Sequence, residues 1–310
     1  MQTIINSEEV QGTGIATQSE VSVEFGNKVL DVLSDTNLNW TVRKEDLISS
    51  TGLTTPNCGI FRNDTNAWLG TVSKKYTPYQ NQDMVKTIVE ASDYIGLNVS
   101  NGGELRGGKH VFIQLELPEE YIGKSNVKRY VTALNSHNGL GSVAFGSTNT
   151  VVVCQNSFYK AYKEIQKFRH HSSAYDKIKL AILELKNTVK EDLRLMETFK
   201  CMASLNVKDE LIHKVVSECF AIDLDSTLDK GRSVKKKDSI IEALDIEQKL
   251  EGNTMWGLFN GVTRYTNHYE TTPNKKNDHI MSGQGYLRNI KAYNLICNYI
   301  EKEHSELVSL

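Results

Sequence analysis

The stretch of sequence that decides the fold is residues 135–158, NSHNGLGSVAFGSTNTVVVCQNSF. It contains a His beside an Asn-Gly pair, two apolar stretches punctuated by glycine, and a Cys-Gln-Asn tripeptide. Asn138-Gly139 suits a two-residue type I′ turn, so the segment predicts two strands joined at this pair. Asn156 or Ser157 then predicts the N-cap of a following helix, because each side chain can accept a hydrogen bond from the first helical turn.

Strand patterns extend from this stretch toward the N-terminus. Two alternating runs flank a turn at residues 63–66, and apolar residues at helical spacing followed by Gly96 predict a helix over residues 83–96. Further strands surround the two glycine pairs of GGELRGG (102–108). Residues 1–22 have no apolar period in their first part and predict a flexible arm, and residues 23–36 predict a short helix.

Beyond residue 157 the apolar period becomes helical. The sequence predicts amphipathic helices over residues 173–199, 207–221, 236–250, 253–270 and 285–307, with a mobile charged loop over residues 223–238. The fold class that follows is α+β. We expect a curved, mainly antiparallel sheet in hairpin–helix–meander order (residues 23–156), then a helical layer (residues 157–310) that packs with the sheet as one unit.

Composition sets broad limits on the class of protein. The 310 residues are 39% hydrophobic and 24% charged, as in an ordinary globular protein. The net charge of -2 excludes a uniformly basic coat but allows a basic stripe on one face. No apolar stretch is long enough to cross a membrane, and the N-terminus lacks a signal pattern, so we expect a cytoplasmic protein with no membrane partner. The five scattered cysteines, without a CxxC pair, predict buried thiols.

Several motifs together resemble those of a phage- and plasmid-borne family described as domain of unknown function 932. The motifs, in the family's order across about residues 60 to 295, are TVSKKYTPYQN (71–81), GGELRGGKHVFIQLELP (102–118), NSHNG (135–139), VVCQNSF (152–158) and TMWGLFNGVTRYTNHYE (254–270). The resemblance implies a mobile genetic element in a bacterial host, but no established activity. It also implies acidic residues where this chain has Asn138 and Asn267, and an Arg where it has Val151.

Two enzymatic hypotheses deserve comparison with structural alternatives. A thiol hydrolase could use Cys154 with His137 and Asn156, but Cys154 ends an apolar strand, where a cysteine usually belongs to the core. A hydrolase or nuclease could instead use His137 and His268, with or without Cys154. If the acidic residues that the resemblance implies act as metal ligands or as a general base, this chain lacks them, because it has Asn138 and Asn267 at those two positions. The histidines lack ligand spacing and no phosphate loop occurs, so we expect no metal and no cofactor.

Basic residues beside aromatic ones recur along the strands and again near residue 264. Lysine and arginine attract phosphates, and exposed aromatic rings stack on unpaired bases. The residues predicted to contact nucleic acid are Lys74, Lys75, Tyr76, Arg106, Lys109, Lys128, Arg129, His137, Arg264 and His268. The structural alternative for each is a solvated charge or a half-buried tyrosine.

The favoured hypothesis is a non-enzymatic protein that binds single-stranded DNA, such as a recombination or strand-annealing factor acting as a homo-oligomer. Its expected sheet-and-helix order resembles, at the level of fold only, the Rad52-like annealing proteins. This hypothesis requires the basic and aromatic side chains to converge on one open furrow. The alternatives are the hydrolase or nuclease, and an interaction module that engages a host protein through its helical half.

Overall fold

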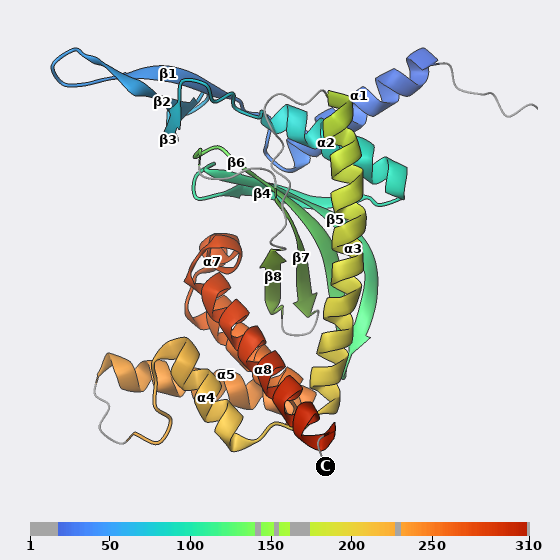
Figure 1. The fold of residues 1–310 in the computed structure, drawn as a ribbon, viewed down its shortest axis with the longest axis vertical. Helices are drawn as coiled ribbons and strands as arrows, with labels where there is room; N and C mark the ends of the chain where they lie inside the picture. Colours follow the sequence, from blue (N-terminus) through green and yellow to red (C-terminus); the bar gives the residue numbers. More distant parts are fainter. Residues whose placement is uncertain (1–17, 140–143, 152–154, 162–173, 227–230, 309–310) are drawn as a thin grey trace, which may run out of the picture.

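The computed structural model describes residues 18–139, 144–151, 155–161, 174–226 and 231–308. A curved five-stranded sheet occupies the centre of the molecule, and a three-stranded sheet projects from its upper end (Figure 1). Helices lie on both sides of the central sheet. The predicted α+β class is confirmed. Among the described residues, every helix is too short or too polar to cross a bilayer.

The N-terminal part contains two helices and the three-stranded sheet. Its elements are α1 (Gln18–Asp35), β1 (Val42–Ile48), β2 (Thr54–Arg62), β3 (Trp68–Ser73) and α2 (Asn81–Ile95). The turn predicted at residues 63–66 is confirmed, with Asn66 in the left-handed region at φ 58°. Gly96 ends α2 at φ 71°, as its position predicted. The helix predicted from residue 23 begins at Gln18, and residues 1–17 of the predicted arm lie outside the described residues.

The central sheet is an antiparallel meander, in which each strand pairs with the next along the chain. Its strands are β4 (Val99–Leu105), β5 (His110–Ile122), β6 (Ser125–Ser136), β7 (Ala144–Val151) and β8 (Ser157–Ala161). Between Leu117 and Glu120 the register of β5 with β6 shifts. This shift surrounds Pro118, which has no N–H for a ladder bond, so the strand continues past the proline at a bulge.

Two local predictions for residues 135–158 are wrong. The connection after β6 is longer than a two-residue turn, because the last paired residues are Leu134 and Ala144. Gly139, at φ 77°, instead packs against Val72 of β3, so this loop contacts the other sheet. The segment after Asn156 is strand β8 and not a helix. It pairs with Gly146–Thr150 of β7 and places Phe158 and Tyr159 in two different hydrophobic clusters.

The C-terminal part is helical. It comprises α3 (Ala174–Ser204), α4 (Asp209–Phe220), α5 (Arg232–Glu251), α6 (Met255–Arg264), the π-helix η1 (Tyr265–Tyr269), the 3-10 turn η2 (Pro273–Lys275), α7 (Lys276–Ser282) and α8 (Gln284–Val308). The predicted helices are present, and α7 is an addition. The loop predicted over residues 223–238 is shorter, because α5 begins at Arg232; residues 227–230 lie outside the described part.

One face of the central sheet is apolar and carries α2 and α3 (Figure 1). Alternate side chains of β5 and β6, such as Ile113 and Val131, pack there against Ala181 and Leu185 of α3. A second cluster joins the helices around Phe199 and includes strand residues of β5, β6 and β8. The strands therefore contribute to the core of the helical part as well as to their own.

A buried ion pair fixes α3 on this face. Arg129 of β6 is 4% exposed, and its Nη2 lies 2.7 Å from Oδ2 of Asp192 on α3, which is fully buried. Arg129 also contacts Glu120, with 3.3 Å between Nη1 and Oε2. The free-energy cost of burying two charges is offset only while each charge keeps its partner. The ion pair therefore holds helix α3 to the sheet.

Replacing Asp192 by Asn should lower the free energy of unfolding by about 3 kcal/mol, because the Arg129 charge then stays buried without its main partner. The matched control is Glu191→Gln, which removes the exposed pair with Arg194 on the same helix and should cost less than about 1 kcal/mol. Urea denaturation measures both values. Equal effects of the two substitutions would contradict a structural role for the buried pair.

Candidate functional site

The second face of the central sheet is largely polar. Because neighbouring side chains of a strand point to opposite faces, residues such as Gln114, Lys128 and Thr148 lie opposite the α3 side. Helix α7 crosses part of this face, where Ile280 and Met281 pack in a small cluster with Leu105, Phe112 and Tyr159. That cluster leaves the rest of the face open beside the helix.

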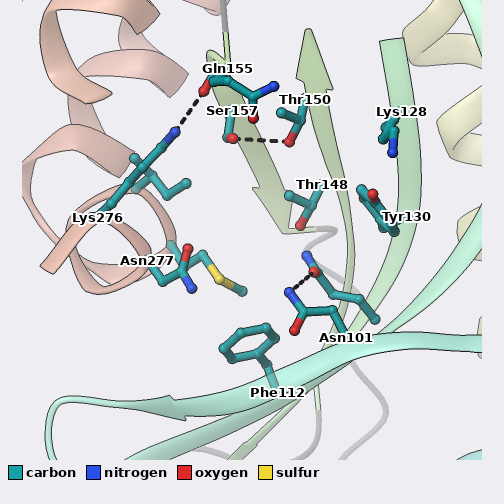
Figure 2. A pocket seen from close by; sticks show the side chains of 13 residues that line it. Asn101, Phe112, Lys128, Tyr130, Thr148, Thr150, Gln155, Ser157, Lys276 and Asn277 are labelled. Carbon is teal, nitrogen blue, oxygen red and sulfur yellow. Dashed lines mark hydrogen bonds between the residues drawn. The ribbon is translucent and has the colours of Figure 1, made fainter. Parts of the chain in front are cut away.

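A pocket of about 370 Å³ lies between α7 and the polar face (Figure 2). It contains two lysines, two aromatic rings, and several amide and hydroxyl groups, and no described residue that lines it carries a carboxylate. The lining residues are Asn101, Phe112, Gln114, Lys128, Tyr130, Thr148, Thr150, Gln155, Ser157, Lys276, Asn277, Ile280 and Met281. The pocket therefore favours an anionic ligand.

The sheet side of the pocket is an internally bonded polar surface. Hydrogen bonds run across four strands and join the side chains of Asn101 and Gln114 (3.3 Å), Gln114 and Thr132 (3.4 Å), and Thr132 and Thr148 (2.7 Å). The hydroxyls of Thr150 and Ser157 lie 2.9 Å apart (Figure 2). These groups satisfy one another, which gives the pocket a preorganised floor.

Other polar groups on the pocket walls remain available. The ammonium of Lys128, the hydroxyl of Tyr130 and the amide of Asn277 have no hydrogen-bond partner among the described residues. Burial raises the pKa of Tyr130, and nearby Glu116 and Glu119 raise it further, so its hydroxyl stays protonated and can donate. Lys128 and Tyr130 come from β6, whereas Asn277 comes from α7 on the other side.

Two contacts anchor helix α7. At the pocket, Lys276 donates from Nζ to the carbonyl oxygen of Gln155, at 2.6 Å (Figure 2). Outside the pocket, the backbone N–H of Arg106 donates to Oδ1 of Asp278 at 2.6 Å, and its guanidinium donates to the carbonyl of Ser282. Gln155 and Arg106 both have positive φ angles, 56° and 53°, which non-glycine residues rarely adopt. These two contacts hold α7 to the loop before β8 and to the turn after β4.

His137, beside Asn138-Gly139, lies in a buried junction between the two sheets and not on the surface. It is 1% exposed, and its Nε2 lies 2.7 Å from Oδ1 of Asn81 at the start of α2. Asn135 donates to the carbonyl of Tyr79 at 3.1 Å in the same junction. The TPYQN and NSHNG motifs thus meet in space. Burial lowers the pKa of His137 to about 4, with smaller effects from the nearby side chains of His110 and Arg62.

Arg264 and His268 lie in a second polar network, at the junction of β8 with α5 and the π-helix. Glu247, fully buried on α5, accepts from Arg264 Nη1 at 2.7 Å and from Asn156 Nδ2 at 3.0 Å. Nε2 of His268 lies 3.0 Å from Oδ1 of Asn156. Glu247 is not among the residues predicted from the sequence, because its partners Arg264 and Asn156 lie far from it along the chain. His268 contacts Asn156, whereas His137 contacts Asn81 in the other junction, and Cys154 lies outside the described residues.

Asn138 and Asn267, where the sequence resemblance implied acidic residues, have structural contacts. Asn267 donates from Nδ2 to the carbonyl of Ser157 at 3.2 Å and accepts from the N–H of the same residue at 3.1 Å. A carboxylate lacks the donor for the first bond. Asn138 accepts from the Ser136 hydroxyl at 2.7 Å. Both amides therefore serve to hold chain segments together.

The remaining predicted nucleic-acid residues are dispersed, so the predicted set does not converge on one open furrow as the sequence-based hypothesis required, and the pocket is a different site. Lys74, Lys75 and Tyr76 follow β3, and Tyr76 packs against the core. Lys109 lies over the ring of Trp68 of β3, at 5.3 Å from its centroid. Arg129, His137 and Arg264 are engaged inside the protein, as described above. Of the predicted set, Lys128 lines the pocket, and Arg106 holds α7 at its edge.

The fold and pocket define an α+β protein with a carboxylate-free polar site between a meander sheet and a short helix. Residues 68–288 match the family described as Domain of unknown function (DUF932), and the chain belongs to this family. All residues that line the pocket fall within the matched range. Neither a search of curated proteins nor one of solved structures found a match.

The stability of the sheet junction should depend on pH through His137. Its folded pKa of about 4 lies below the unfolded value of about 6.5, so the unfolded state binds the proton first as the pH falls. Neutral His137 contributes up to about 3 kcal/mol to the free energy of unfolding. This contribution is fully present above about pH 6.5 and is lost as the pH falls toward 4.

The variant His137→Gln isolates this effect, because Gln can bond to Asn81 but does not titrate. Unfolding free energies of both proteins are measured by urea denaturation from pH 7.5 to pH 4, values chosen to span the two pKa values. As the pH falls, the unfolding free energy of the wild type should decrease relative to that of the variant. A difference that does not change with pH would contradict the buried, neutral His137.

Proposed function

We propose that this protein binds single-stranded DNA on the polar face of the central sheet, with closest contact in the pocket beside α7. The observation that carries the proposal is the lining of this pocket. Lys128 and Lys276 provide cationic groups, Tyr130 provides a ring, and no described lining residue is acidic. Phosphates are attracted by lysine and bases stack on aromatic rings, which is the combination used for unpaired strands.

The pocket favours a single strand over a duplex. It is a recess beneath a helix, so a ligand must insert a small group into it. Bases in a duplex are paired and stacked, whereas those of a single strand are free to turn outward. Arg106, in the turn between β4 and β5, is outside the pocket and bonds to Asp278 and Ser282 of α7.

Strand annealing or recombination is the activity we assign to this binding. The order of a meander sheet and a long helix, α3, suggests an analogy with the Rad52-like annealing proteins; this analogy, which no structural match accompanies, is the argument for the assignment (Figure 1). In such an activity, a homo-oligomer would align several pockets along one strand. The hydrolase alternative has less support, because His137 and His268 lie in separate networks.

Binding should fall when Lys128 is neutralised. Lys128→Gln should weaken affinity for a fluorescein-labelled oligothymidylate about fivefold at low salt and reduce the salt dependence by about one phosphate contact. The matched control is Lys190→Gln, since Lys190 is exposed on α3 and outside the pocket. Fluorescence anisotropy at two salt concentrations measures both effects. A wild-type protein that binds no single strand at low salt would refute the proposed function.

A further inference from the structure

We propose that the pocket receives one unstacked nucleotide of the bound strand, with its phosphate at Lys128, its base against Tyr130 and the edge of the base at Asn277. This proposal rests on the proposed function and specifies the unit that the site recognises. Its starting point is the division of the pocket into satisfied and available groups. The hydroxyls and amides of the floor bond to one another, whereas these three side chains have no hydrogen-bond partner among the described residues.

The three available groups differ in the chemistry they recognise. The Lys128 ammonium is a cation that attracts a phosphate. Tyr130 offers a ring face for stacking and a protonated hydroxyl. Asn277 offers both a donor and an acceptor, which is the pattern that amide side chains use to bind the edge of a base. A free phosphate would use only the donors of these groups, whereas a nucleotide would also use the Tyr130 ring face and the amide's acceptor.

The position of Asn277 is fixed by its neighbours in the chain. Lys276 is bonded to the carbonyl of Gln155, and Asp278 accepts the N–H of Arg106. Asn277 therefore stands between two anchored residues, across the pocket from β6 (Figure 2). An amide held in this way needs little reordering when a base arrives, which favours binding of the edge.

The arrangement also explains why a single strand suits the site. A base can reach Asn277 only after it leaves its stack and turns into the recess beside α7. In a single strand, this movement breaks no base pair, and contact with Tyr130 replaces part of the lost stacking. The flanking nucleotides remain outside the recess.

The test compares two labelled strands of equal length and charge, an oligothymidylate and an abasic deoxyribose-phosphate strand, by fluorescence anisotropy at low salt. The wild type should bind the base-bearing strand about tenfold more tightly, as expected for a stacked base. Tyr130→Ala and Asn277→Ala should each reduce this ratio toward one, with little change in affinity for the abasic strand. The matched control is Asn274→Ala, an exposed residue of η2 outside the pocket, which should keep the wild-type ratio.

The outcomes separate this inference from the proposed function. Equal affinity of the wild type for both strands would overturn the nucleotide pocket and leave DNA binding through phosphates. Binding to neither strand would overturn both. Free thymidine monophosphate that competes as well as the oligomer would also overturn the inference, because the pocket would then recognise a small nucleotide and not a unit of a strand. Thermal melting of each variant verifies that it is folded.

Discussion

The two-sided character of the five-stranded sheet is the constraint on which the rest of the structure depends. Its apolar face must be covered, and α2 and α3 cover it, with the buried pair of Arg129 and Asp192 holding the long helix in place. Strand geometry then sends every second side chain to the other face. Lys128 and Tyr130 thus point away from α3, on either side of Arg129, because Arg129 points toward it.

Polar junctions connect this sheet to its surroundings. His137 and Asn81 join it to the three-stranded sheet and α2, while Asn156 and Glu247 join it to the helical part. Each junction combines motifs that are far apart in the sequence. A buried amide or imidazole without a partner is costly, so such pairs specify one arrangement of the elements and not merely a compact state. The motifs of the family are therefore explained in part by architecture.

The pocket follows from these two features together. The sheet provides an ordered polar floor, and α7 provides the opposite wall, held through Lys276 and Arg106. None of the described residues that line the pocket carries a carboxylate, which separates it from the clusters around Arg129 and Arg264, where the arginine faces an acidic partner. This contrast is why the pocket, and not the histidines, is the site on which we base the proposed function.

The sequence by itself determined the elements whose signals are local. The helical periods, the turn at residues 63–66 and the end of α2 at Gly96 depend on residues a few positions apart, and all are present. The tertiary structure decided what depends on distant partners. Strand β8 is five residues long and is defined by pairing with β7, and Asn277 reaches the site only because α7 packs on Tyr159 and Phe112. Periodicity identifies the faces of an element, but the contacts between those faces arise only when the whole chain is packed.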